Sequence, residues 1–186
     1  MSWPDRQLHR TLRTAAALAL AALLAGCFQP LYGDRSIDGS PSLRDALAAI
    51  DVDQIPAPRA TDEARLAVEI RNALIFDFTG GGYPAPPTHR LKVAIISTRA
   101  SIIVDIQTSR PDVENYGINA TYSLTEIASG KVVVNGQTFA RVSYDVPGQQ
   151  QRFARQRGLR DAESRAAKVI AENVRSRLAS YFIAGT

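Results

Sequence analysis

The chain contains one cysteine, Cys27, and two histidines, His9 and His89. A single cysteine cannot form an intramolecular disulfide bond, so no disulfide framework supports the fold. The sequence also lacks zinc-ligand spacing, a serine-nucleophile motif and a dinucleotide-binding glycine motif. A hydrolase would need a nucleophile and a base, and no such pair is recognisable. We therefore expect no enzyme, no cofactor, no metal site and no catalytic residue.

Long apolar runs are scarce, and the one present, Ala15–Leu24, is about ten residues long, too short to cross a bilayer. It is preceded by Arg6, Arg10 and Arg13 and followed by Leu24-Ala25-Gly26-Cys27. Positive charge, an apolar run, small residues and a cysteine, in this order, are typical of a bacterial lipoprotein signal peptide. We expect residues 1–26 to be removed and Cys27 to carry the acyl chains that anchor the protein to a membrane. The alternative is an ordinary secretory signal with a chance cysteine.

A strong charge of one sign is also lacking. The net charge is +4, and the expected signal peptide, with three arginines and one aspartate, accounts for half of it. The remaining charge of about +2 gives no general attraction to polyanions, and we expect no nucleic-acid partner in an exported protein. Hydrophobic residues make up 45% of the chain, as in an ordinary globular fold. We expect a lipidated tether over residues 27–44 and a single domain over residues 45–186.

Changes of hydrophobic period divide this domain into elements. Apolar residues four positions apart follow the N-cap residue Thr61 and predict a helix that ends at Gly80-Gly81-Gly82. Alternation predicts strands, and a long apolar stripe predicts a C-terminal helix. The strands are expected at 47–55, 90–106 (bulged or kinked near 97–101), 118–124 and 132–144, with a polar connection over 108–116 and the last helix over about 150–182.

The predicted order is β-α-β-β-β-α. Each amphipathic helix needs an apolar surface, and an alternating antiparallel sheet offers one on one face. We therefore predict an α+β fold, a two-layer sandwich in which a four-stranded, mainly antiparallel sheet carries two helices on one face.

Charged side chains offer a few candidate contacts. Asp51 and Asp53 share one strand face, where a solvated surface is the simpler interpretation of two carboxylates. The last helix carries eight basic residues against three acidic ones, which fits a solvated face, an acidic partner or a phosphorylated lipid. A smaller basic set belongs to the sheet and its connections: Arg99, Arg110 and Lys131.

Short motifs in a fixed order give the chain a resemblance to a known family. Cys27-Phe28-Gln29-Pro30-Leu31-Tyr32-Gly33 is similar to the Cys-Gly-Phe-x-Pro-Leu-Tyr-Gly start of alphaproteobacterial LptE lipoproteins, without their glycine after the cysteine. Further similar segments follow in the family's order: Ser109-Arg110, 120–124, Ser129-Gly130, Ser143-Tyr144, Asp161-Ala162 and 177–182. The sequence therefore resembles an LptE lipoprotein over the whole chain after Cys27.

This resemblance implies a non-enzymatic outer-membrane protein on the periplasmic side, which plugs the lumen of the β-barrel LptD. It implies a role in assembling that barrel and in moving lipopolysaccharide to the outer leaflet. Arg99, Arg110 and Lys131 are then candidates to bind lipopolysaccharide phosphates directly, because arginine and lysine bind phosphate well. The alternative is an auxiliary lipoprotein of a lipid-trafficking ABC transporter that faces the periplasm.

Overall fold

The computed structural model describes residues 41–105, 110–146 and 152–185, without the side chains of 103–105, 110–112 and 152. The chain divides into residues 1–42, which lie almost wholly outside the described part and include Cys27, and a folded unit over residues 43–186. The elements of the folded unit, in chain order, are α2 (Leu43–Ala48), β1 (Ile50–Val52), α3 (Asp62–Thr79), β2 (His89–Asp105), β3 (Arg110–Glu126), β4 (Val132–Asp145) and α4 (Arg152–Ala184).

The four strands form one sheet in the order β1-β2-β3-β4. The short β1 pairs in parallel with β2, with Ile50 opposite His89. The β2–β3 and β3–β4 pairs are antiparallel over most of their length. The predicted α+β class and the mainly antiparallel four-stranded sheet are confirmed, and the parallel β1–β2 pair makes the sheet mixed.

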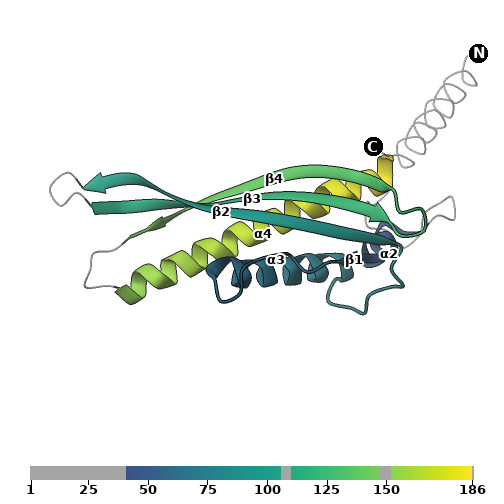
Figure 1. Ribbon diagram of the computed structural model, residues 1–186, viewed down its shortest axis with the longest axis horizontal. Coiled ribbons are helices and arrows are strands. Elements are labelled where there is room, and N and C mark those ends of the chain that lie inside the picture. Colours follow the sequence, from purple (N-terminus) through teal and green to yellow (C-terminus); the bar gives the residue numbers. More distant parts are fainter. Residues whose placement is uncertain (1–40, 106–109, 147–151, 186) are drawn as a thin grey trace, which may run out of the picture. The chain divides into compact units, whose positions relative to one another are not determined.

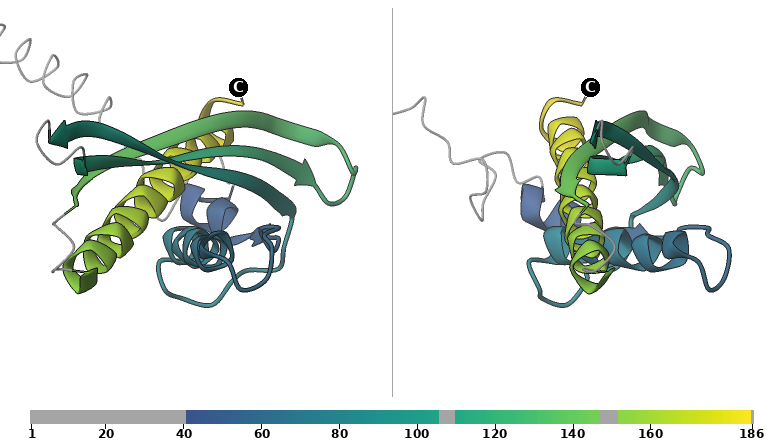
Figure 2. Two further views of the ribbon diagram at one scale, coloured as in Figure 1. Left: turned by 60° about the vertical axis from the view of Figure 1, so that its left-hand side comes forward. Right: turned by 90° about the vertical axis from the view of Figure 1, so that its left-hand side faces the viewer.

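Both long helices lie on one face of the sheet, as predicted (Figures 1 and 2). Helix α4 packs on β3 and β4, and α3 packs against α4 and against β1 and β2. The opposite face of the sheet is left without a covering layer by the described residues. The polar and apolar residues on that open face are therefore part of the molecular surface.

Helix α3 begins and ends where the sequence indicates. The Thr61 side chain accepts a hydrogen bond from the backbone N–H of Ala64 at 3.2 Å, which satisfies one of the free amides at the helix start. At the other end Gly80 adopts a left-handed conformation with φ of 63°, which glycine reaches without steric cost. The predicted apolar stripe, including Leu66, Ile70 and Leu74, is fully buried.

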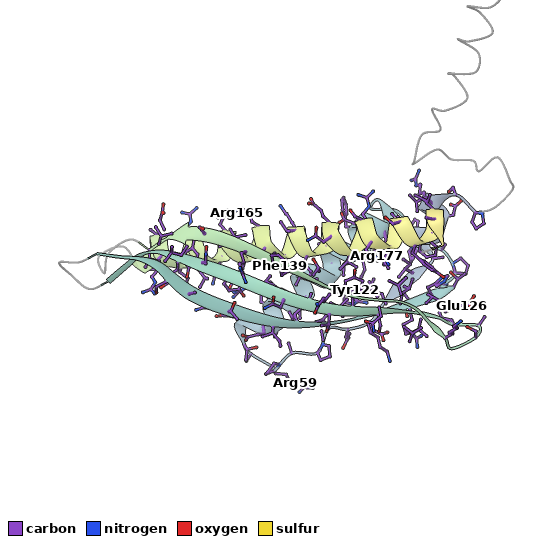
Figure 3. All side chains as sticks on the ribbon, turned by 90° about the horizontal axis from the view of Figure 1, so that it is seen from above. Arg59, Tyr122, Glu126, Phe139, Arg165 and Arg177 are labelled. Carbon is purple, nitrogen blue, oxygen red and sulfur yellow. The ribbon has the colours of Figure 1, made fainter. Side chains whose placement is uncertain are left out.

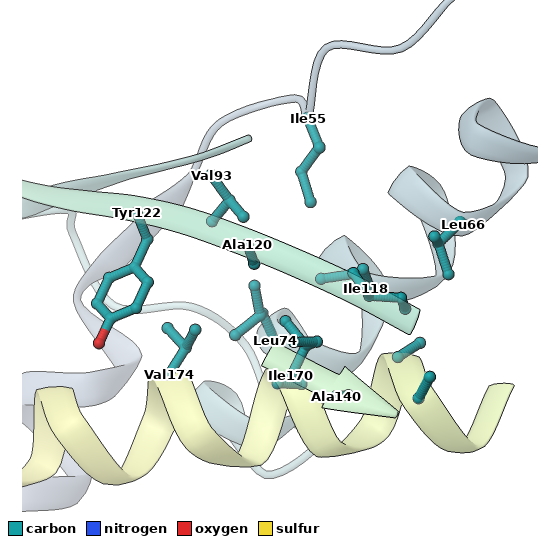
Figure 4. Close-up of a cluster of buried hydrophobic side chains, with 14 of the residues drawn as sticks. Ile55, Leu66, Leu74, Val93, Ile118, Ala120, Tyr122, Ala140, Ile170 and Val174 are labelled. Carbon is teal, nitrogen blue, oxygen red and sulfur yellow. The ribbon is translucent and has the colours of Figure 1, made fainter. Parts of the chain in front are cut away.

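Small side chains on α4 allow it to approach the sheet closely. Its buried face is rich in alanine, including Ala162, Ala166 and Ala167, and continues through Ile170 and Val174 (Figure 4). These residues meet a row of β3 side chains on the covered face of the sheet, Ile118, Ala120 and Tyr122 among them. The core thus lies between the sheet and the two helices.

Three boundaries differ from the sequence prediction. The segment 47–55 was predicted as strand throughout, but Leu43–Ala48 is a helix and only Ile50–Val52 is strand. The polar connection predicted over 108–116 is wrong from Arg110 onward, because β3 already begins there. The irregularity expected in β2 near 97–101 falls just beyond, between Ser101 and Val104.

Candidate functional site

The three basic residues proposed from the sequence lie far apart in the structure. Arg110 is the first residue of β3, and its side chain lies outside the described part. Lys131 is exposed beside the opposite end of β3, where its carbonyl accepts from the N–H of Glu126 at 2.9 Å. The strand between them spans roughly 50 Å at about 3.3 Å per residue. Arg99 lies between these ends, opposite Tyr116. The three residues therefore cannot bind one phosphate group together.

Arg99 already has carboxylate partners. Its Nη2 lies 2.9 Å from Asp62 Oδ2 on α3 and 4.0 Å from Glu163 Oε1 on α4. Its guanidinium also lies over the ring of Tyr116, 6.0 Å from the centroid. The side chain remains 46% exposed, so part of its guanidinium still faces solvent. Arg99 thus joins the sheet to both helices.

Glu163 is the buried centre of this group, and its side chain is only 2% exposed. Arg65 on α3 donates to its Oε2, whereas Oε1 has no hydrogen-bond partner among the described residues. Burial raises the pKa of Glu163 above its ordinary value, and the neighbouring Arg65 opposes that shift only in part. We call Asp62, Arg65, Arg99 and Glu163 the Glu163 cluster. It ties α3, β2 and α4 together.

A second polar cluster lies near the start of α4. Tyr144 on β4 donates to Glu114 on β3, and Arg155 Nη2 lies 3.2 Å from the other oxygen of Glu114. Burial, together with the hydrogen bond to Glu114 and the charge of that residue, raises the pKa of Tyr144 to about 12. We did not identify this cluster from the sequence, where Glu114 fell in the predicted connection. This cluster holds the start of β3 and the end of β4 to the start of α4.

Five basic residues of α4 fall into two groups. Arg155 pairs with Glu114, and Arg165 pairs with Asp161 at 2.8 Å and donates to the carbonyl of Ser143 at 3.3 Å. Within the described part of the chain, a second set is exposed and makes no ion pair: Arg157, Arg160 and Lys168. The first group has structural contacts, and the second is available to solvent or to a partner.

The uncovered face of the sheet carries few charged side chains in its middle rows, where Arg141 is the charged residue, whereas Lys92 lies on the same face nearer the start of β2. Phe139 on this face is labelled in Figure 3. Aligned rows across β2, β3 and β4 are Ala94–Thr121–Gln137, Ile96–Asn119–Phe139, Thr98–Gly117–Arg141 and Ala100–Asn115–Ser143. In these rows Ile96 is 69% and Phe139 63% exposed, and Arg141 lies over the Phe139 ring. We call this surface the outer face. Its signal in the sequence was the second set of alternating positions in each strand, for which we proposed no function from the sequence.

The remaining candidates have structural explanations. Asp51 and Asp53 both lie within 3.5 Å of the Arg90 guanidinium, so the paired carboxylates hold an arginine. The ring of His89 lies edge-on against that of Phe182, with the ring centroids 5.2 Å apart, and burial lowers the pKa of His89.

Metal-binding groups and membrane-spanning helices are also absent from the described part of the chain. Among the described residues no group of three or more histidine, cysteine, aspartate or glutamate side chains could hold a metal ion. No helix in the described part is both long and apolar enough to span a bilayer.

Solved structures of bacterial lipoproteins share this fold. A lipoprotein described from Caulobacter crescentus CB15 is 18% identical, with a TM-score of 0.59 over 76% of this chain and 96% of that one. Lipoprotein B from Nitrosomonas europaea is 9% identical, with a TM-score of 0.54 over 73% and 84%. Rare lipoprotein B from Shewanella oneidensis is 10% identical, with a TM-score of 0.50 over 73% and 95%. Among curated proteins, none matches the sequence.

The fold is thus one found in solved structures of bacterial lipoproteins. The family model LptE, lipopolysaccharide-assembly, matches residues 47–178, which is most of the folded unit. The chain belongs to the LptE family. The resemblance found in the sequence is confirmed, and membership supports a role in lipopolysaccharide transport.

Proposed function

We propose that this protein is an outer-membrane lipoprotein, anchored through Cys27, that occupies the lumen of the LptD barrel from the periplasmic side. There it assists assembly of the barrel and takes part in moving lipopolysaccharide to the outer leaflet. The match of the LptE family model to residues 47–178 carries this proposal. The signal-peptide pattern that ends at Cys27 supports the anchor.

The outer face supports the placement in a barrel. The interior of a large outer-membrane barrel is polar, so a plug needs a surface that tolerates both water and polar walls. Hydroxyl and amide side chains such as Thr121, Asn119 and Gln137 can donate and accept hydrogen bonds without the cost of burying a charge. The uncharged polar side chains of this face therefore suit contact with such a wall.

Direct contact with lipopolysaccharide is the finer part of the proposal, and it keeps Arg99, Arg110 and Lys131 as candidates. Because they lie along the length of β2 and β3, each would meet a different phosphate or a different position of the lipid. Arg99 is the weakest candidate of the three, since Asp62 already neutralises it. Lys131 and Arg110 lie at opposite ends of the sheet.

Co-purification tests the proposed function. The full-length chain is expressed with its cognate LptD barrel, extracted in mild detergent and recovered through an affinity tag at the C-terminus. We expect the barrel in about equal amount, and labelled palmitate in the protein but not in its Cys27→Ser variant. Recovery of inner-membrane transporter subunits in place of the barrel would contradict the proposal and favour an auxiliary transporter lipoprotein.

A further inference from the structure

The two edges of the sheet differ in how far they are covered. At the β4 edge, α4 contacts the strand through side chains: Arg165 donates to the Ser143 carbonyl, and Asn173 donates to the Thr138 hydroxyl at 3.0 Å. At the other edge, β1 pairs only with residues 89–91 of β2, and one further bond joins Asp53 N–H to the Leu91 carbonyl. Among the described residues no strand pairs with β2 beyond this point on that side.

The direction of the backbone groups follows from this last bond. In an antiparallel ladder, successive residues turn their N–H and C=O groups to opposite neighbours. Leu91 faces β1, so the residues two, four and more positions later face the same open side. These are Val93, Ile95, Ser97, Arg99 and Ser101. A row of unpaired backbone donors and acceptors of this kind is a template for another strand.

Natural edge strands are usually protected by charges, prolines or bulges. Residues 93–102 contain no proline, their one charged residue is Arg99, and the bulge comes only after Ser101. The side chain of Arg99 is turned to the covered face, where Asp62 pairs with its charge at 2.9 Å. The edge therefore has little protection against the addition of a strand.

The side chains beside this edge indicate what kind of strand would fit. On the outer face β2 presents Ala94, Ile96, Thr98 and Ala100, and Ile96 is 69% exposed. On the covered face, the same stretch presents Ile95, which packs against the core, and the polar residues Ser97, Arg99 and Ser101. A strand that alternates apolar and polar residues would continue both surfaces, and strands of outer-membrane barrels alternate in this way.

We propose that the open edge of β2, residues 95–101, binds a strand of the β-barrel partner by main-chain hydrogen bonding. This inference rests on the proposed function. A barrel that has not yet closed exposes strand edges of its own, so the contact fits the assembly step. The apolar residues of the added strand cover Ile96, and its polar residues lie beside Ser97 and Ser101.

Two matched double variants test the edge. Proline at positions whose N–H faces the open side removes the edge donors without breaking the β2–β3 ladder. Ser97→Pro with Ser101→Pro is compared with Ser97→Ala with Ser101→Ala, which loses the same hydroxyls, including the bond from Ser97 to Glu63, but keeps both N–H groups. Each variant is co-expressed with the barrel, and the amount of barrel that co-purifies is measured. We expect the alanine double variant to recover an amount within about twofold of that recovered by the unchanged chain. The proline double variant should recover at least about fivefold less than the unchanged chain.

Hydrogen exchange measured for individual amides of the unchanged chain is an independent test. It does not depend on whether the proline double variant folds. In the free protein the amides of Ile95, Ser97, Arg99 and Ser101 should exchange fast, and those of Ile96, Thr98 and Ala100 slowly. In the barrel complex the first set should become at least tenfold slower. Equal recovery with the two double variants, or no new protection, overturns the edge contact and leaves the proposed function intact. No barrel recovered with the unchanged chain overturns both.

Discussion

At the residue scale, the most consequential side chain is Glu163. A carboxylate that is 2% exposed loses most of its hydration, and only one of its oxygens has a hydrogen-bond partner among the described residues. The positive charges of Arg65 and Arg99 compensate in part. Because burial outweighs them, the pKa of Glu163 in the folded state is raised above its ordinary value.

The raised pKa predicts how stability depends on pH. A carboxyl whose pKa is higher in the folded state stabilises the fold most below the pKa of the unfolded chain, about 4.3. That contribution is lost as pH rises through the folded value. We expect urea unfolding from pH 4 to 7.5 to show the wild-type protein losing stability relative to Glu163→Gln as pH rises. Asp161→Asn, an exposed carboxyl on the same helix, is the control. A difference that is constant with pH, or that changes in the opposite direction, would contradict this.

At the element scale, close packing between β3 and β4 depends on a missing side chain. Tyr122 is 6% exposed and lies across Gly136 on the neighbouring strand. A Cβ atom added at Gly136 would lie 2.6 Å from the Tyr122 hydroxyl and 2.7 Å from the ring carbon that bears it. The ring would have to move, although it is held by the core between the sheet and α4.

We therefore expect Gly136→Ala to destabilise the protein by about 1–3 kcal/mol, the usual cost of overpacking a core. The measurement is the urea unfolding midpoint. In a Tyr122→Leu background the same alanine should cost less, because the clashing atoms are gone; the double-mutant cycle isolates that coupling. An equal cost in both backgrounds would show that the glycine is needed for some other reason.

The elements predicted correctly are those whose covered face is apolar. The stripe of α3 and the alternation of Leu91 and Val93 were readable because burial selects apolar side chains. The first part of β3 could not be read in this way, because its covered face carries Glu114, which is satisfied by Tyr144 and Arg155. Those partners lie about thirty to forty residues away in the sequence. Helix α2 has six residues, too few to show a helical period.

The sequence allowed us to predict which residue types belong to the candidate site, but not how they are arranged in space. Arg99 was selected for its charge, but the sequence gives no sign that Asp62 and Glu163 meet it, since the nearer of these is 37 positions away. The outer face has a clear pattern in the register of the strands. Alternation alone does not distinguish a polar face that meets water from one that meets a partner.

At the scale of the whole molecule, two of the three basic candidates, Arg110 and Lys131, lie at opposite ends of a long domain. Helix α4, with 33 residues, is about 50 Å long. Arg155 near its start is tied to Glu114 on β3, whereas Phe182 near its end contacts His89. Arg110 belongs to the first end, and Lys131 lies near the second. A lipid that contacts both residues would have to do so at two separate places.

This separation predicts independent effects of two charge reversals on lipopolysaccharide binding. We expect Arg110→Glu and Lys131→Glu each to weaken binding of purified lipopolysaccharide roughly three- to tenfold, the loss of one charge-assisted contact. Residues so far apart do not couple, so the double variant should show the product of the two factors. Binding is measured by titration with the thermal unfolding midpoint as a check. Arg99 is unsuitable, because reversal there would place a third carboxylate beside Asp62 and Glu163.

Arg59 supplies the matched control, an exposed arginine in the connection between β1 and α3 (Figure 3). Arg59→Glu changes the net charge by the same amount, so any general loss of attraction between the protein and an anionic lipid appears equally in this variant. An effect of Arg110→Glu or Lys131→Glu that exceeds the control identifies a local contact. If both variants weaken binding only as much as the control does, these contacts are ruled out. Charge reversal would then be applied to the exposed basic residues of α4, which are Arg157, Arg160 and Lys168.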